Sequence, residues 1–250
     1  MISVPTIEQL KQLMAYMRAI VFPDYFLSQN EPHYGLRGVL LCQLSAVDPQ
    51  RATELTEAFM TEVPAIARLV HTDVDAVLHN DPAVTDRGEI ILSYPLTQVM
   101  LHFRTAHVLY RLGVPRIPRM LTELAHSRTG IDIHPAATIG DYFCIDHGTG
   151  VVIGETAIIG SHVVLYQGVT LGAKNFEYDA DGKPMDIPRH PILEDHVTVY
   201  SNTSILGRVT IGHHTVVGGN VWLTHDVPPY SRIVQQKAVQ SIYFADGEGI

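Results

Sequence analysis

The second half of the chain holds five residues whose chemistry could activate a hydroxyl group: Asp132, Asp146, His147, Arg189 and His190. A neutral histidine with a pKa near 7 can accept the proton of an alcohol, so His147 is the candidate general base. A carboxylate on the other ring nitrogen fixes the tautomer and orientation of the imidazole, and this is the role predicted for Asp132. Arginine binds carboxylates in a bidentate manner, so Arg189 is the candidate partner for the acid group of a substrate.

Each of these residues also has an ordinary structural interpretation. Aspartates at tight turns commonly accept hydrogen bonds from turn amides, which could account for Asp132 and Asp146. Arg189 could be a solvated loop charge. Most of the fourteen histidines are expected to be surface or corner residues, and His213 and His214 are typical of a solvated turn. Both interpretations remain open from residue types and spacing.

A six-residue period in the apolar residues begins after Gly130 and predicts the scaffold for these side chains. One register contains Ile133, Ile139, Ile145, Val151, Ala157, Val163 and Val169, and a second contains Ile153, Ile159, Leu165 and Leu171; both continue from Leu193 to Leu223. This period is typical of a solenoid whose short strands meet at tight corners and stack apolar side chains inside. We therefore predict a β-helix of hexapeptide repeats. A β-sandwich is disfavoured, because its turn signals would lie about 8–12 residues apart.

This β-helix would bring chemical groups together at its corners. Fifteen residues separate Asp132 from His147, which places them on neighbouring turns. The repeat lapses after Gly172, and we predict an excursion loop over residues 173–190. Long loops on a rigid scaffold often carry function, and this one ends in Arg189 and His190.

The first half of the chain has a different period. Apolar residues recur at helical spacing, as in Ile7, Leu10, Met14 and Met17, and groups of proline and glycine interrupt the pattern. The predicted fold class is α+β, with an N-terminal α-helical bundle followed by a left-handed parallel β-helix. The predicted domains are a helical domain over residues 1–130, a β-helix over residues 131–234 and a C-terminal tail over residues 235–250.

The composition of the 250 residues disfavours several classes of protein. With 46% hydrophobic and 17% charged residues, the chain can bury a sizeable core. No run of about eighteen apolar residues and no signal peptide is present, so we expect no membrane span and a cytoplasmic location. The net charge of −9 and the pI of about 5.8 disfavour nonspecific binding to nucleic acid. Only Cys42 and Cys144 are present, and their separation fits a reducing compartment.

The segment Gly130–Thr156, which reads GIDIHPAATIGDYFCIDHGTGVVIGET, resembles bacterial serine O-acetyltransferases of the hexapeptide-repeat acyltransferase family. Arg189-His190-Pro191 and Asp81-Pro82-Ala83 extend the resemblance. It implies transfer of the acetyl group of acetyl-CoA to the hydroxyl of L-serine, giving O-acetyl-L-serine in cysteine biosynthesis. It also implies acetyl-CoA as a co-substrate, no permanently bound cofactor and no metal.

The resemblance implies roles for individual residues. His147 matches the catalytic base of the family, and Asp132 matches the carboxylate that orients it. Four positions match those that hold serine: Asp81, Asp146, Arg189 and His190. The first two match positions near the amino group of serine, and Arg189 matches a position near its carboxylate. Direct attack of serine on the thioester would need no covalent acyl-enzyme, because backbone amides can stabilise the oxyanion.

The resemblance also implies partners for the chain. Backbone groups around Gly172 and Ala173 match an acetyl-CoA site that lies between neighbouring subunits, so we expect a homotrimer or a dimer of trimers. L-cysteine is expected to inhibit by occupying the serine pocket. The chain ends in Ile250, and many family members use a terminal isoleucine to bind O-acetylserine sulfhydrylase, so this enzyme is a predicted partner.

Three features depart from the family pattern. The loop before Arg189 is longer and lacks the usual glycine run, and Gly148 follows His147 where alanine is common. The segment 234–238 replaces a turn that contains glycine and proline. The loop and the 234–238 segment concern the contacts expected for the pantetheine arm of acetyl-CoA, whereas Gly148 leaves the predicted dyad untouched.

Three other functions are compatible with the same repeat. An acetyltransferase for sugars or other small hydroxyl compounds would explain the solenoid but not Asp81 or the later Asp, His and Arg set. A zinc hydratase of the trimeric carbonic anhydrase kind would use histidines as metal ligands. A noncatalytic assembly scaffold would bind no CoA.

Overall fold

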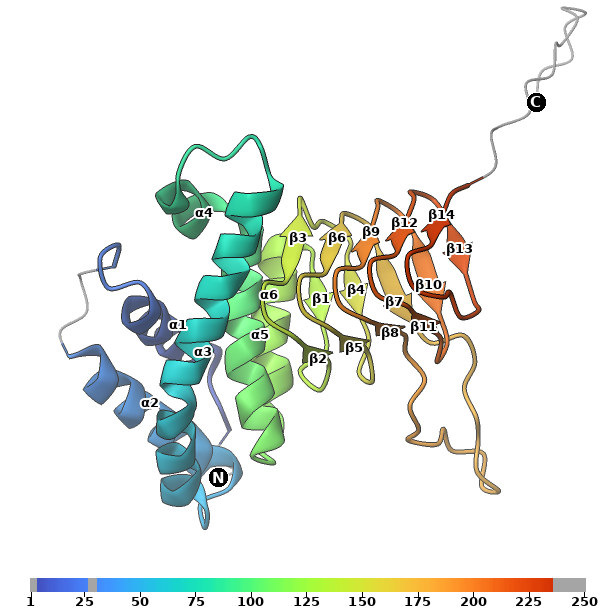
Figure 1. The fold of residues 1–250 in the computed structure, drawn as a ribbon. Helices are drawn as coiled ribbons and strands as arrows, with labels where there is room; N and C mark the ends of the chain where they lie inside the picture. Colours follow the sequence, from blue (N-terminus) through green and yellow to red (C-terminus); the bar gives the residue numbers. More distant parts are fainter. Residues whose placement is uncertain (1–3, 27–30, 236–250) are drawn as a thin grey trace, which may run out of the picture.

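The computed structural model describes residues 4–26 and 31–235. Its first half consists of helices, six of them in the described residues, and its second half of short parallel strands (Figure 1). The helices are α1 (Ile7–Val21), α2 (Pro32–Val47), α3 (Ala52–Asn80), α4 (Arg87–Ser93), α5 (Pro95–Arg111) and α6 (Ile117–Thr129). The predicted order of a helical bundle followed by a parallel β-helix is confirmed.

The helix boundaries follow local chemistry. Thr6 caps α1 by accepting a hydrogen bond from the amide of Gln9, and Asp86 caps α4 in the same way. Proline is the first residue of α2 and α5 and the second of α6, where its missing N–H costs no helical hydrogen bond. Gly130 ends α6 in the left-handed conformation that glycine adopts without strain. The chain then enters its first strand two residues later.

Three parallel sheets form the faces of the β-helix. Face I has the order β1-β4-β7-β10-β13, face II β11-β8-β5-β2, and face III β14-β12-β9-β6-β3. The strands of face I are β1 (Asp132–Ile133), β4 (Val152–Ile153), β7 (Thr170–Gly172), β10 (Ser204–Leu206) and β13 (Trp222–Leu223). Those of face II are β2 (Thr138–Ile139), β5 (Ile158–Ile159), β8 (Ile192–Leu193) and β11 (Thr210–Ile211). Those of face III are β3 (Cys144–Asp146), β6 (Val164–Tyr166), β9 (Thr198–Val199), β12 (Val216–Val217) and β14 (Arg232–Ile233).

The interior of the β-helix matches the apolar registers read from the sequence. On face I, the column Ile133, Ile153, Leu171, Ile205 and Leu223 is buried and paired in register from turn to turn. Two threonines, Thr203 and Thr215, occupy interior positions where other turns carry apolar residues. Their hydroxyls donate to the backbone oxygens of Gly218 and Pro228, so the buried polar groups are satisfied.

The repeat is interrupted once, between β7 and β8, where the excursion loop leaves the corner between faces I and II and projects from the solenoid (Figure 1). Much of the loop is exposed, and a single antiparallel bridge joins Tyr178 to Pro184. The strand that follows the loop resumes the stacking, because β8 pairs with β5 of the preceding turn. The loop is therefore an insertion at a corner rather than the end of the solenoid.

A buried ion pair fastens the helical half to the first turn of the solenoid. Arg104 of α5 binds both carboxylate oxygens of Asp73 of α3 and donates to the backbone oxygens of Ile139 and Gly140, at 2.5 and 2.6 Å. Asp73 in turn accepts a hydrogen bond from the amide of Phe143. The exposed fractions of these two side chains are 4% and 0%. These contacts hold helices α3 and α5 against the chain segment that leads into β3.

Within the part of the chain that the structure describes, no helix combines the length and apolar character needed to cross a bilayer. Cys144 is buried and Cys42 is exposed, and both are free thiols.

Candidate active site

His147 lies at the corner between faces III and I, directly after Asp146, the last residue of β3. Its backbone is left-handed, with φ of 58°, and its side chain is 74% exposed. The next residue, Gly148, has φ of 91°, and a Cβ there would lie 2.5 Å from the side chain of Ile131. Glycine therefore suits this corner, because a larger residue would be strained at this φ and would press on the side chains of Ile131 and Ile145.

A small pocket opens beside this corner, between the helical half and the solenoid. We call it the junction pocket; its lining residues are Val77, Asn80, Asp81, Tyr94, Cys144, Ile145, Asp146, Val164 and Tyr166. Asp81 lies at the C-terminal end of α3, Tyr94 between α4 and α5, and Asp146 and Tyr166 are register partners on face III. The pocket thus combines two carboxylates with an adjacent imidazole.

The two carboxylates of the junction pocket have different partners. Asp81 accepts hydrogen bonds from the hydroxyl of Tyr94 at 2.7 Å and from the amide of Ala83 at 2.8 Å. The hydrogen bond from Tyr94, followed by that from Ala83, lowers the pKa of Asp81. Asp146 lies 3.8 Å from Nε2 of His147, measured from Oδ1. Asp81, Asp146 and His147 were all predicted site residues, and the structure brings them together.

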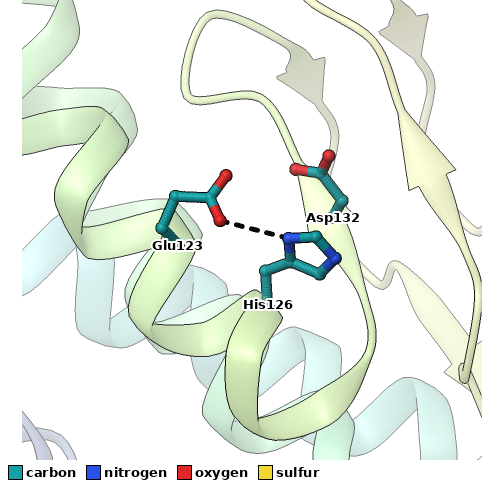
Figure 2. A group of neighbouring side chains, drawn as sticks. All are labelled: Glu123, His126 and Asp132. Carbon is teal, nitrogen blue, oxygen red and sulfur yellow. Dashed lines mark hydrogen bonds and ion pairs between the residues drawn. The ribbon is translucent and has the colours of Figure 1, made fainter.

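Asp132 lies elsewhere in the structure. Its Oδ1 accepts a hydrogen bond from Arg119 of α6 at 3.0 Å, and no hydrogen bond joins it to His147 in the described residues. Arg119 also pairs with Glu123. Glu123 in turn contacts His126, with 3.2 Å between its Oε2 and the Nδ1 of the ring, as the dashed line in Figure 2 marks. Asp146 is therefore the carboxylate paired with the His147 ring here, and the pairing of Asp132 with His147 stays a prediction.

The group of Glu123, His126 and Asp132 could supply three ligands to a metal ion, because one ligand atom of each lies within 4.8 Å of the others. Figure 2 shows the two carboxylates on either side of the His126 ring. The guanidinium of Arg119, however, already pairs with both carboxylates. A cation would have to displace this internal charge, so we interpret the group as an ion-pair network that ties α6 to β1.

Arg189 and His190 lie at the corner between faces I and II. With Glu155 and Thr156 they form what we call the arginine corner. The guanidinium of Arg189 pairs with Glu155, and the amides of Arg189 and His190 donate to the hydroxyl oxygen of Thr156, at 2.8 and 3.0 Å. The strands of face I are parallel, so the corner that precedes them and the corner that follows them lie at opposite edges. Arg189 and His190 therefore do not join His147 within one chain.

His190 is held as a neutral imidazole. Its Nδ1 accepts a hydrogen bond from the amide of Thr156 at 3.1 Å, which places the proton of the neutral ring on Nε2. Burial, followed by the charge of Arg189, lowers the pKa of His190 to about 4. A Cβ on Gly154 would lie 2.0 Å from this ring, so the glycine makes room for it.

Gly172 and Ala173 lie at the end of β7 and the start of the excursion loop, near the arginine corner. The backbone oxygen of Gly172 accepts a hydrogen bond from the amide of Gly207 in the next turn, at 2.9 Å. The predicted role of Gly172 and Ala173 in binding acetyl-CoA stays a prediction. Ile250, the predicted anchor for a sulfhydrylase, lies outside the described residues.

Sequence reasoning missed two tyrosines of the junction pocket. Tyr166 is the register partner of Asp146, so counting one turn of the repeat forward from Asp146 could have found it. Tyr94 precedes a proline at the start of a helix, and nothing in its local pattern points to Asp81, thirteen residues earlier. Only the packing of α4 and α5 on α3 reveals that contact.

No protein-family model matches the chain. The chain is 42% identical to the protein named serine acetyltransferase, plasmid, of Synechococcus elongatus, over 98% of this chain and 86% of that protein. This chain belongs to the serine acetyltransferase family. Serine acetyltransferases are acyltransferase enzymes, so the predicted enzyme class is confirmed.

Solved structures of the family share the fold. Serine acetyltransferase isoform 3 of Entamoeba histolytica, solved in complex with cysteine, has a TM-score of 0.83 and 34% identity, covering 94% of this chain and 85% of that one. A serine acetyltransferase solved in complex with CoA has a TM-score of 0.64 and 25% identity, covering 91% of this chain and 96% of that one. The resemblance drawn from the Gly130–Thr156 segment is thus confirmed at the level of family and fold.

Proposed function

We propose that this protein transfers the acetyl group of acetyl-CoA to the hydroxyl of L-serine, giving O-acetyl-L-serine and CoA. The observation that carries the proposal is the junction pocket: two carboxylates, Asp81 and Asp146, lie beside an accessible imidazole, His147. An ammonium group is the natural ligand of paired carboxylates, and a hydroxyl within reach of an imidazole can lose its proton to it. Family membership and the cysteine and CoA complexes of relatives support the same reaction.

In the proposed mechanism, His147 takes the proton of the serine hydroxyl as the oxygen attacks the thioester carbonyl. The new C–O bond gives a tetrahedral intermediate, whose collapse breaks the C–S bond, and His147 returns the proton to the CoA thiolate. No acyl-enzyme forms. Positioned base catalysis of this kind is worth roughly 10²–10⁴ in rate. Asp132 remains the proposed orienting carboxylate, although in this structure it pairs with Arg119.

We also propose that the complete site forms between two copies of the chain. The arginine corner lies at the opposite edge of face I from His147, so one chain cannot place Arg189 and His190 in its own junction pocket without large movement. In a trimer with solenoids side by side, the arginine corner of one copy would face the junction pocket of its neighbour. Arg189 would then bind the carboxylate of serine, and acetyl-CoA would lie near Gly172 and Ala173 in the same cleft. The helical halves would join two such trimers.

The direct test mixes the protein with acetyl-CoA and a panel of L-serine, L-homoserine and galactosides while the release of free thiol is followed. We expect thiol release that depends on L-serine and a product with the mass of O-acetyl-L-serine. Release with galactosides but not with serine would identify a sugar acetyltransferase instead. CO₂ hydration that depends on zinc, with no thiol release, would favour the hydratase. Absence of both CoA binding and CO₂ hydration would favour the noncatalytic scaffold.

The proposed partner needs a separate test, because it depends on residues beyond the junction pocket. A synthetic peptide of residues 241–250 is titrated into O-acetylserine sulfhydrylase, with a peptide lacking Ile250 as its control. Tighter binding of the complete peptide would support C-terminal capture. Equal affinities would remove this partner and leave the acetyltransferase proposal unchanged.

A further inference from the structure

Tyr94 lies at the junction of two helices, and its backbone is fixed there. It ends α4 and precedes α5, with φ of −76° and ψ of 133°. Pro95 follows it, and a residue before proline is restricted to such extended conformations. Its amide donates to the backbone oxygen of Ile90 at 3.1 Å. The phenol ring therefore projects from a rigid segment into the junction pocket.

Among the residues that the structure describes, the hydroxyl of Tyr94 has one hydrogen-bond partner, the carboxylate of Asp81. The distance from Oη to Oδ2 is 2.7 Å, while Oδ1 of Asp81 accepts from the amide of Ala83. Each oxygen of Asp81 thus has its own donor, one from a side chain and one from the backbone. This arrangement fixes the plane of the carboxylate, which a single donor would leave free to rotate.

We propose that Tyr94 is a positioning residue that holds Asp81 as an oriented carboxylate for the ammonium group of the amino-acid substrate. The inference rests on the proposed function, because it concerns how the same pocket recognises serine. Tyr94 acts on serine through Asp81 and takes no part in proton transfer.

The electrostatics of the pocket explain why such a residue is useful. The charged and titratable groups that face Asp81 and Tyr94 are Glu89 on α4, Asp146 and Cys144 on β3, Tyr166 on β6, and His147 at the corner. Carboxylates that lie near one another raise each other's pKa. The hydrogen bond from Tyr94 lowers the pKa of Asp81 and so keeps Asp81 ionised. The same contact raises the pKa of Tyr94 to about 12, so the phenol keeps its proton and remains a donor.

The test compares two acceptors that differ only in the amino group. Tyr94→Phe removes the hydroxyl and keeps the ring, and kcat/KM is measured with L-serine and with 3-hydroxypropionate. We expect a loss of roughly tenfold with L-serine, carried by KM, since hydrogen bonds to charged groups are strong. With 3-hydroxypropionate, which lacks the ammonium group, we expect no change. Asp81→Asn should give the same pattern, and the double variant should lose no more than Asp81→Asn alone.

Controls separate a positioning role from a structural one. Tyr34→Phe, at an exposed position of α2, should leave both acceptors unaffected. Calorimetric titration measures the affinity for L-serine without turnover. If the wild-type protein binds serine but releases no CoA, the proposed function is wrong, whereas the role of Tyr94 in binding serine still stands. Equal losses with both acceptors, or unchanged kcat/KM and affinity for serine in Tyr94→Phe, would overturn the inference about Tyr94.

Discussion

The junction pocket and the arginine corner both carry predicted serine-binding residues, yet they are built in different ways. The pocket takes residues from the end of α3, the α4–α5 junction and two strands of face III. The arginine corner consists only of solenoid residues, and Glu155, Thr156, Arg189 and His190 bind one another. The pocket therefore depends on the docking of the helical half, whereas the corner depends only on the stacking of turns.

The two regions also differ in how many of their groups already have partners. His147 is 74% exposed and its nearest carboxylate oxygen is 3.8 Å away, which leaves its ring available to a substrate. Arg189 and His190 are held by hydrogen bonds before any ligand arrives. In the proposed mechanism, the proton acceptor is thus left accessible, while the groups proposed to bind serine are preorganised by their neighbours.

The largest effect is expected from removing the imidazole of the junction pocket. Asparagine tolerates the left-handed backbone, so His147→Asn should keep the fold while lowering kcat by at least about 10². Turnover is measured by thiol release and folding by thermal melting. His214→Asn is the matched control, because His214 is also exposed and left-handed, with φ of 56°. Turnover near the normal rate in His147→Asn would remove this residue as the base.

The docking of the helical half can be broken at its buried ion pair. Arg104→Met leaves Asp73 buried without its partner, which should lower the free energy of unfolding by about 3–5 kcal/mol. Urea unfolding measures the loss, and Asp73→Asn combined with Arg104→Met should recover part of it. Arg189→Gln, in the partly exposed arginine corner, should cost less than about 1 kcal/mol. Equal costs for the two arginine variants would contradict the proposed difference between the regions.

Mixing two inactive variants would show whether the two regions meet between copies. His147→Asn and Arg189→Gln are each expected to have little activity. In trimers assembled at random from equal amounts of both, about one site in four would combine an intact His147 with an intact Arg189 from the neighbour. Thiol release should therefore rise to about a quarter of the normal rate after the two are refolded together. If subunits exchange but thiol release does not rise, the two residues do not act together across neighbouring copies.

The roles of Asp132 and Asp146 can be separated by kinetics. If Asp132 orients His147, Asp132→Asn should lower kcat by more than about tenfold, because the imidazole loses its preferred tautomer. Asp146→Asn, in the junction pocket, should mainly raise KM for serine. An unchanged kcat in Asp132→Asn would restrict Asp132 to its ion pair with Arg119.

The smallest effect concerns the pH dependence of stability at the arginine corner. The pKa of His190 is lowered to about 4 in the folded protein, from its ordinary value of 6.5. Below pH 6.5, His190 therefore binds a proton more readily in the unfolded chain than in the folded protein. The stability linked to neutral His190 is present above pH 6.5 and is lost as the pH falls towards 4. Urea midpoints of His190→Asn should therefore change less between pH 7 and pH 5 than those of the unaltered protein. Parallel pH profiles would contradict a neutral, buried His190.

The residue pattern alone determined the architecture and the family. The six-residue register after Gly130 predicted the stacked interior, because each turn of a β-helix repeats the same local geometry. The helical spacing of the first half predicted helices for the same local reason. The motif from Gly130 to Thr156 identified the family, and it named Asp146 and His147, which are adjacent in the chain and so share a corner.

Only the tertiary structure decided which of the predicted residues share a site. Asp81 joins Asp146 because α3 docks on face III, a contact between segments more than sixty residues apart. Asp132 pairs with Arg119 because α6 packs on β1, which the count of residues between Asp132 and His147 could not reveal. Tyr94 reaches Asp81 through the packing of three helices. Such contacts depend on how elements dock, and docking is set by nonlocal packing rather than by any repeat in the chain.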